Sequence, residues 1–389
     1  MNLRRKFLVL LLLIIIIWSF TGYMPGDKTI VANYDKNVFY PYQTLRGCLF
    51  GSIPFSLGDI LYVIAGLGLL ILIIRWLINL IRFGQTMGEL TAAGLKLVNT
   101  VLAVYLLFLI SWGANYYKPP LSELWELNGH NRLTLKLKSD SSSIDAEWVP
   151  DTPSVKFLRA RDSVAIVSFD KFLVDKLNAF APYYTPLAFD DINERSKNYY
   201  REYTNSKVKK FGLEIKPSFF GYFLERMAVE GYYNPFTGEG QIDAKLPAFI
   251  MPFLVCHEMA HQAGIAAEGD ANLLSYTLCT TTNDTSFKYA AYLNIWLYTN
   301  NRLYRRDSAM ANKFESKLNK LTKAHIDTLE ELSKKYNNEM ARYSGEIYDS
   351  YLKMQDQKEG IRSYSNVAVS AWQVELKRKK GIGGQIIIP

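Results

Sequence analysis

The chain has 389 residues, of which 49% are hydrophobic and 21% are charged. This composition excludes an intrinsically disordered chain, which would hold fewer apolar and more charged residues. The net charge is +8, but the basic residues are dispersed, apart from a short run at residues 377–380. Such a pattern is typical of a solvated face near an anionic membrane and argues against a nucleic-acid partner. Three cysteines are too few for a disulfide-stapled scaffold.

The first predicted element is the uncharged, strongly apolar stretch at residues 7–24, which follows basic residues 4–6. Two interpretations fit it, a cleaved signal peptide and an uncleaved membrane anchor. A cleavage site needs small residues after the apolar core, whereas the bulky Trp18 and Tyr23 stand there. This favours the anchor.

Two further apolar stretches, at about 57–80 and 90–112, are each long enough as helices to cross a hydrocarbon layer of ~30 Å. The alternative is a pair of buried core helices in a soluble protein. The near absence of charge, together with Trp112 and Tyr116 at one end, favours transmembrane helices, because aromatic residues gather at membrane interfaces. The sequence therefore predicts three spans in contact with a lipid bilayer.

The distribution of positive charge predicts the orientation of these spans. Basic residues 4–6, Arg75 and Arg82 flank one side, whereas the connection between the first two spans mixes sparser basic residues with acidic ones. Positive residues are retained in the cytoplasm, so the N-terminus is expected inside. We therefore expect a multi-pass anchor at residues 1–117 and an extracytoplasmic domain at residues 118–389.

The second part of the chain is predicted to be mainly helical with a small β component. Residues 131–170 contain short β-like pieces at 133–137 and 164–167, and residues 189–206 have helical spacing. Residues 308–343 are predicted to form one long amphipathic helix. Its expected buried stripe comprises Phe314, Leu318, Leu321, His325, Leu329 and Leu332.

The most informative motif is His257-Glu258-Met-Ala-His261. On a helix the two histidines lie one turn apart on the same face, where both imidazoles can bind one metal ion. Glu258 can then reach a water at the metal and act as a general base. Pro252 can start this helix and Gly264 can end it through a left-handed cap.

Catalytic zinc usually keeps three protein ligands, so a third is expected downstream. The next acidic residues are Glu268 and Asp270. Glu268 followed one turn later by Asn272 resembles the E-x-x-x-D element of gluzincins, in which the glutamate binds zinc and the later residue orients a ligand histidine. We therefore prefer Glu268 as the ligand, keep Asp270 as the alternative, and assign Asn272 the orienting role, although aspartate is commoner there.

Two interpretations compete with a catalytic site. The histidines can be hydrogen-bonded core residues, but this leaves Glu258 and Glu268 unexplained. The metal site can instead be structural. Structural zinc usually has four cysteine or histidine ligands, whereas two histidines and a glutamate, with a spare glutamate, form the set of thermolysin-like hydrolases.

The chain resembles a bacterial membrane-protein family, domain of unknown function 3810, which has three N-terminal spans and an HExxH-bearing domain. The resembling segments are Pro54–Asp59, Trp112–Tyr117, Tyr233–Glu239, the motif helix with Glu268, Tyr351–Lys353 and Gly360–Tyr364. They extend along the whole chain except residues 129–185. The resemblance implies this architecture and a metal site, and it names no substrate.

Each of three other features of the sequence allows two interpretations. Residues 233–242 are either an edge strand that pairs with a substrate or an ordinary hairpin. Arg362 and Tyr364 are either hydrogen-bond donors to a reaction oxyanion or ordinary helix residues. Cys256 is expected to be either a buried thiol or bridged to Cys279.

The leading hypothesis is a membrane-anchored zinc metallopeptidase with a gluzincin-like, and so zincin-like, α+β domain. His257, His261 and Glu268 would hold Zn²⁺, and Glu258 would activate water against a peptide or protein substrate. The hypothesis from another class is a non-catalytic envelope scaffold, whose late helices bind a partner while a metal stiffens the fold. The sequence leaves the oligomeric state open.

Overall fold

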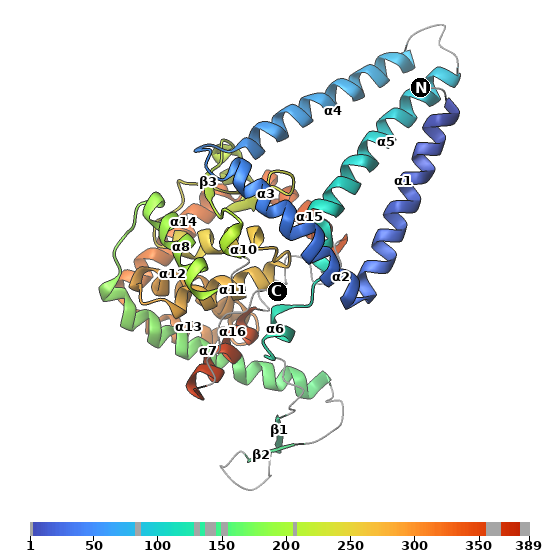
Figure 1. The fold of residues 1–389 in the computed structure, drawn as a ribbon. Coiled ribbons are helices and arrows are strands. Elements are labelled where there is room, and N and C mark those ends of the chain that lie inside the picture. Colours follow the sequence, from blue (N-terminus) through green and yellow to red (C-terminus); the bar gives the residue numbers. More distant parts are fainter. Residues whose placement is uncertain are drawn as a thin grey trace.

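The structure is a computed structural model that describes residues 3–81, 87–127, 133–136, 145–148, 155–204, 208–354 and 367–381. Three long helices project from one side of a mainly helical body (Figure 1). They are α1 (Leu3–Tyr23), α4 (Leu57–Ile81) and α5 (Met87–Ser111), and each is long and apolar enough to cross a bilayer. The three predicted spans are confirmed within a few residues at their ends.

The three spans present almost their whole apolar surface outward, with 0 to 11% of their most apolar windows buried. A soluble core helix would bury that surface, so the surface is suited to lipid. The span α1 packs along α5, where Lys6 Nζ donates to the Ala92 carbonyl at 2.7 Å and Asn99 Nδ2 donates to the Lys6 carbonyl at 3.0 Å.

The segment between α1 and α4 folds onto the body instead of forming a loose loop. Its elements are η1 (Met24–Gly26), α2 (Lys28–Tyr34), the π-helical η2 (Asp35–Phe39) and α3 (Tyr40–Phe50). Phe39 is fully buried and lies 6.1 Å, between ring centroids, from both Trp112 and Phe211. Residues on both sides of position 117 therefore share one hydrophobic core.

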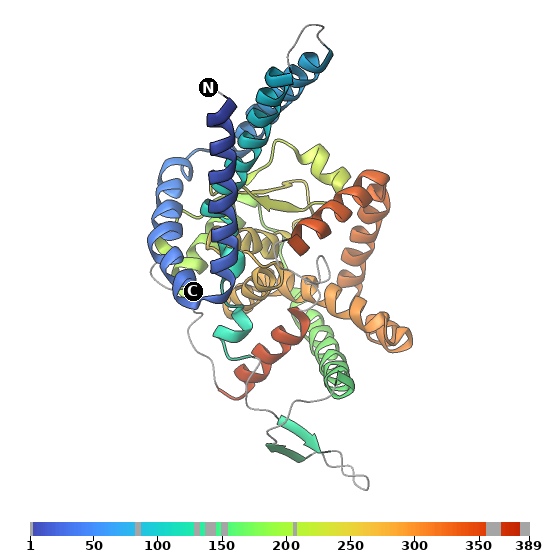
Figure 2. The ribbon, with the colours of Figure 1, turned by 90° about the vertical axis from the view of Figure 1, so that its right-hand side faces the viewer.

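The body begins directly after α5 and is built around three buried helices, α10 (Met251–Gln262), α11 (Glu268–Thr281) and α12 (Thr285–Tyr304). The remaining helices surround this centre (Figures 1 and 2). They are η3 (Gly113–Tyr117), α6 (Leu121–Leu124), α7 (Val155–Phe180), η4 (Ala181–Tyr183), α8 (Phe189–Tyr203), η5 (Val208–Lys210), α9 (Gly221–Met227), α13 (Ser308–Glu315), α14 (Lys320–Tyr336), α15 (Glu339–Met354) and α16 (Val367–Lys379).

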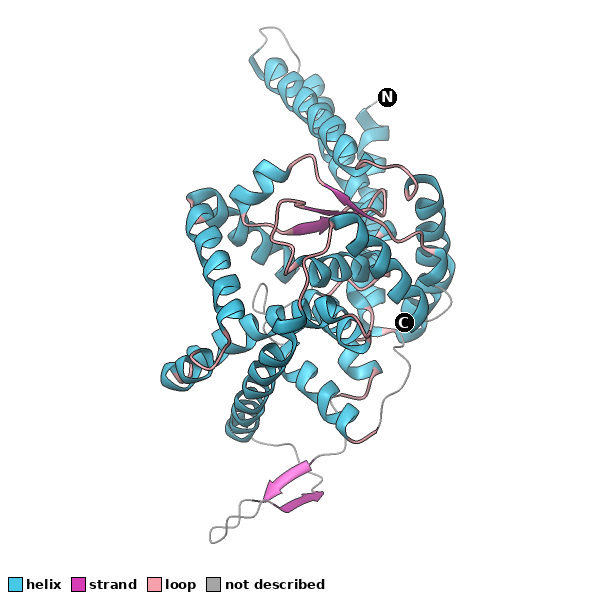
Figure 3. Ribbon diagram, turned by 90° about the vertical axis from the view of Figure 1, so that its left-hand side faces the viewer, coloured by secondary structure: helices cyan, strands magenta, loops and turns pink. Residues whose placement is uncertain are grey.

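Two small sheets complete the described fold (Figure 3). Strands β1 (Leu133–Lys136) and β2 (Asp145–Trp148) form an antiparallel pair in which Leu133 lies opposite Trp148. The second sheet has the order β3-β5-β4, with β3 (Ile215–Pro217) parallel and β4 (Gly231–Tyr233) antiparallel to the central β5 (Gly240–Ile242). This sheet packs on α10.

Two sequence predictions are wrong. The β-like piece at residues 164–167 lies inside the helix α7, and only the piece at 133–137 begins a strand. The single helix predicted at 308–343 is three helices, because it is interrupted at two asparagines. Asn319 caps α14 by accepting from the Thr322 N–H at 2.9 Å, and Asn338 caps α15 by accepting from the Ala341 N–H at 3.0 Å. The predicted stripe is correspondingly broken, with Phe314 buried and Leu321 40% exposed.

Candidate metal centre

The helix α10 starts and ends as its sequence predicts. Pro252 stands in its first turn, and Gly264 follows its last residue with φ of +90°, a conformation that favours glycine. The Ile265 N–H donates to the Ala260 carbonyl at 3.1 Å, which closes the end of the helix. Every residue of α10 is buried. The motif therefore sits on a short, fully buried helix at the centre of the body.

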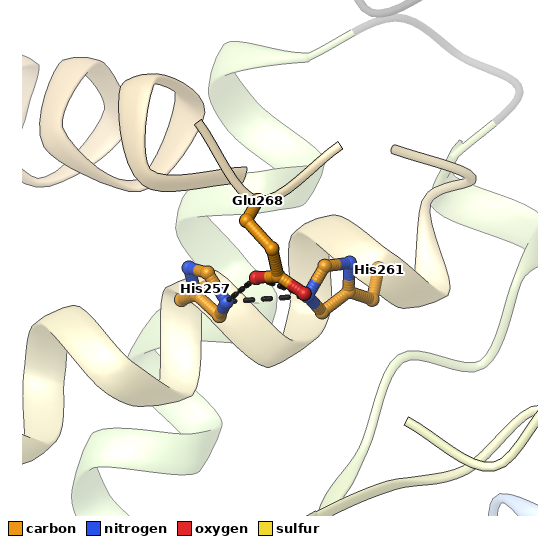
Figure 4. A group of neighbouring side chains, drawn as sticks. All are labelled: His257, His261 and Glu268. Carbon is orange, nitrogen blue, oxygen red and sulfur yellow. Dashed lines mark hydrogen bonds and ion pairs between the residues drawn. The ribbon is translucent and has the colours of Figure 1, made fainter. Parts of the chain in front are cut away.

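Three potential ligands meet where α10 faces the start of α11 (Figure 4). His257 Nε2 lies 3.2 Å from His261 Nε2. Glu268 Oε2 lies 3.2 Å from the first and 3.4 Å from the second of these nitrogens. All three residues are buried, and within the described ranges their spacing is suited to a metal ion. We call His257, His261 and Glu268 the metal group.

Asp270, the alternative third ligand, points to another part of the molecule. Its Oδ2 accepts a hydrogen bond from the Leu121 N–H at 3.2 Å. Burial raises the pKa of Asp270 to about 6, against the effect of that hydrogen bond. The structure thus brings Glu268, and not Asp270, to the two histidines.

The histidine rings are held unequally. His261 Nδ1 lies 2.7 Å from the Ile265 carbonyl, which orients the ring so that Nε2 faces Glu268. His257 Nδ1 has no hydrogen-bond partner. Asn272 is buried, but its Nδ2 atom also lacks a partner. The orienting role assigned to Asn272 therefore stays a prediction, and in the structure the Ile265 carbonyl performs that task for His261.

The electrostatics of the group favour a positive charge at its centre. Burial opposes the ionisation of Glu268, yet the adjacent histidines outweigh it and hold the pKa of this carboxyl well below its usual range. Burial likewise disfavours the charged form of His261, but the Glu268 carboxylate raises its pKa to about 9. A proton on His261 thus balances the negative charge of Glu268, as a bound metal cation would.

Glu258 lies beside this group and is not one of its ligands. Its side chain is buried, and its Oε2 atom has no hydrogen-bond partner. Burial raises the pKa of Glu258 to about 7, although both histidines pull it down. A Cβ added at Gly231 of β4 would lie only 2.7 Å from Glu258 Oε1, so the bare backbone at this position makes room for the carboxylate.

Two residues contact the metal group although the sequence did not link them to it. Tyr348 of α15 donates its hydroxyl hydrogen bond to Glu268 Oε1, from a position 80 residues away in sequence. Trp112, directly after α5, packs edge-on against His261 with 6.1 Å between ring centroids. No local spacing links either residue to the motif helix. Arg362 and Tyr364, the predicted oxyanion donors, lie outside the described residues.

A second buried polar cluster joins the first turn of α4 to the β3-β5-β4 sheet, and we call it the span junction. Lys216 Nζ lies 2.5 Å from Glu239 Oε1, and Glu239 Oε2 accepts from the Gly58 N–H at 2.6 Å. Asp59 accepts from the Tyr232 hydroxyl and, at 2.8 Å, from the Phe219 N–H. The strand β4 beside Glu258 is thereby fixed to a membrane span.

Two of the segments that carry the family resemblance, Pro54–Asp59 and Tyr233–Glu239, meet at this junction, and a third, Trp112–Tyr117, borders the metal group. Residues 34–369 match the family described as Protein of unknown function (DUF3810). The chain belongs to this family. The match covers the spans α4 and α5, the junction and the metal group of this DUF3810 chain. No curated protein and no solved structure matches it.

The cysteines of this DUF3810 chain stand apart from the metal group. Cys256 and Cys279 are both fully buried free thiols, and Cys48 is an exposed one. Cys256 lies on the side of α10 that faces away from the ligands, and its Sγ atom is 3.5 Å from Ser196 Oγ. Of the two readings of Cys256, the structure shows the buried thiol.

Proposed function

We propose that this DUF3810 protein is a membrane-anchored, zinc-dependent metallopeptidase. The observation that carries the proposal is the meeting of His257 Nε2, His261 Nε2 and Glu268 Oε2 within 4.8 Å of one another, with the unpartnered carboxylate of Glu258 beside them. A small sheet on the motif helix, with the antiparallel β4 at its edge, fits a gluzincin-like domain.

The donor set fits a catalytic zinc ion better than a structural one. Two histidine nitrogens and one carboxylate oxygen leave a position open, whereas structural zinc is usually enclosed by four cysteine or histidine ligands. Glu268 Oε2 lies 3.2 and 3.4 Å from the two Nε2 atoms, so the three donor atoms converge on one point, as a shared cation requires. When bound, the ion supplies Lewis acidity, which activates water near neutral pH and polarises a carbonyl.

The protein groups have separate tasks in this proposal. Glu258 takes the proton from the attacking water and passes it to the leaving amine. Tyr348 holds Glu268, and the Ile265 carbonyl holds His261, so that the ligands keep their orientation. The strand β4 lies at the edge of its sheet beside Glu258, the position at which an extended peptide substrate would pair.

We further propose that the catalytic domain lies outside the cytoplasm of a bacterial cell, attached to the cytoplasmic membrane. The ends of α1 and α5 that face away from the body meet at Lys6 and Ala92. This end of the bundle also carries Arg4, Arg5 and, in α4, Arg75. Positive residues are retained in the cytoplasm, which puts the body on the opposite side.

The substitution Glu258→Gln tests the proposal. It removes the base but keeps the size of the side chain, so hydrolysis of a fluorescently quenched unfolded protein should fall by ~10²–10⁴-fold. Zinc stoichiometry and thermal stability should stay unchanged, and Glu331→Gln, an exposed substitution on α14, should retain full activity. A Glu258→Gln protein that loses zinc and folding together would instead favour the scaffold with a structural metal.

A further inference from the structure

The helix α15 has an apolar face that no described part of the body covers. Met340 and Tyr343 are 45% and 52% exposed, and Ile347 and Met354 are 71% and 78% exposed. At 100° per residue these four side chains fall within an arc of roughly 60°. We call this arc the outer face of α15. A soluble surface seldom concentrates large apolar side chains in this way.

The opposite side of α15 faces the interior and the metal group. Leu352 is fully buried, and Tyr348 donates a hydrogen bond to Glu268 Oε1. The same helix therefore presents one face to the candidate ligands and another, strongly apolar, to its surroundings. Exposed polar residues such as Glu346 and Ser350 lie on the helix beside the outer face. The outer face is therefore a limited apolar patch and not part of a wider apolar surface.

The contacts of α15 place it at the level where the spans leave the body. Tyr351, next to the outer face on the helix, packs against Phe108 in the last turn of α5, with 6.4 Å between ring centroids. Its hydroxyl lies 3.3 Å from that of Tyr116, just after the same span. In Figure 1, α15 lies behind α3, between the near ends of α4 and α5.

A second group of exposed aromatic residues adjoins α15 around α9. Phe219, Tyr222 and Phe223 are 53 to 59% exposed. Phe219 stacks on Phe55, which lies two residues before the span α4, with 6.5 Å between ring centroids. The helices α9 and α15 also pack together. Aromatic residues concentrate at the boundary between membrane and water, so this group marks the same boundary.

We propose that the outer face of α15 lies in the interfacial layer of the bilayer, with lipid as its occupant. The face is continuous with the lipid-exposed spans through Phe108 and, by way of α9, through Phe55. An amphipathic helix that lies in this layer buries its apolar side ~5–10 Å below the headgroups. The metal group then lies close to the membrane surface, behind a helix that touches both lipid and Glu268.

Fluorescence quenching by lipid tests this placement. In a full chain with Cys48→Ser, a bimane label is attached at Ile347→Cys or Met354→Cys, since Cys256 and Cys279 are fully buried. The protein is reconstituted into phosphatidylcholine and phosphatidylglycerol vesicles whose acyl chains carry bromine. We expect both labels to lose most of their fluorescence, more with bromine near the headgroup than near the bilayer centre, because the helix lies at shallow depth.

The matched control is Leu321→Cys, which also replaces an exposed apolar residue on a late helix. It lies in the first turn of α14, where the Asn319 N–H donates to Asn178 Oδ1 of α7. Figure 1 shows α7 on the side of the body away from the spans. The label at position 321 should keep its fluorescence. Equal fluorescence at 347, 354 and 321 would overturn the proposal. A blue-shifted but unquenched label at 347 would also overturn it, because a second copy or another protein would then cover the face. Neither result depends on metal or on hydrolysis.

Discussion

The metal group and the span junction are both buried clusters of charged side chains, and they differ in how their polar atoms are satisfied. At the junction, Lys216 Nζ donates to Glu239 and to the Phe50 and Phe55 carbonyls. At the metal group, Glu258 Oε2, Glu268 Oε2 and His257 Nδ1 accept or donate no hydrogen bond. Buried polar atoms are nearly always paired. The paired cluster is therefore complete as it stands, whereas the incomplete pairing of the other fits the metal ion that we propose.

This comparison predicts its largest effect at the junction. Glu239→Ala leaves the Lys216 ammonium, whose side chain is 2% exposed, without a carboxylate to balance its charge. The full chain in detergent micelles should lose about 3–5 kcal/mol of stability, because an unpaired buried charge is costly. Thermal and denaturant unfolding measure the loss.

The control for this substitution is Glu123→Ala, in the exposed pair of Lys28 and Glu123. Exposed ion pairs contribute no more than about 1 kcal/mol. If Glu239→Ala costs no more than Glu123→Ala, the junction does not hold the span to the sheet.

The next-largest effect concerns zinc, which should stabilise the protein through the metal group and not through the span junction. Zinc at a free concentration of 100 times its dissociation constant should stabilise the native protein by about 2.7 kcal/mol. Glu268→Ala should abolish this gain, because it removes a ligand, while Asp270→Ala should keep it, since Asp270 bonds to Leu121. Thermal shift with and without chelator measures both. Should Asp270→Ala prove to be the variant that loses zinc, the third ligand is wrongly assigned.

A smaller effect is expected at Tyr348, which supports a ligand without being one. Tyr348→Phe removes the hydrogen bond to Glu268 Oε1 and should weaken zinc binding by ~10–100-fold in competition with a chelator. Tyr343→Phe removes a hydroxyl from the outer face of the same helix and should leave affinity unchanged. Equal affinities for the two variants would mean that Tyr348 does not position Glu268.

The parts of the site that the sequence predicts are those set by local geometry. His257, Glu258 and His261 occupy one helix, whose periodicity fixes their faces, and the turn at Gly264 brings Glu268 back over them. Tyr348 comes from a helix 80 residues downstream, so only tertiary packing reveals it. Sequence spacing carries no information about such a contact.

The errors in the fold have equally specific reasons. Residues 164–167 are a short apolar run, and such a run fits a strand or a buried helix alike; here the helix α7 continues through it. The prediction at 308–343 rests on the apolar period, but two side-chain caps outweigh that period: Asn319 starts α14 and Asn338 starts α15. The sequence predicts the spans well, because helices of 21 to 25 predominantly apolar residues leave little alternative.

The hydrogen bond between the Gly58 N–H and the Glu239 carboxylate has a consequence for biosynthesis. The two residues are 181 positions apart, yet Glu239 accepts from the Leu57 and Gly58 N–H groups that open α4. A ribosome delivers this span to the membrane long before it synthesises the carboxylate. During that interval the first turn of α4 can rely only on water and headgroups for its exposed donors. The anchor therefore reaches its final form only when the sheet has folded, so that insertion and maturation are separate events.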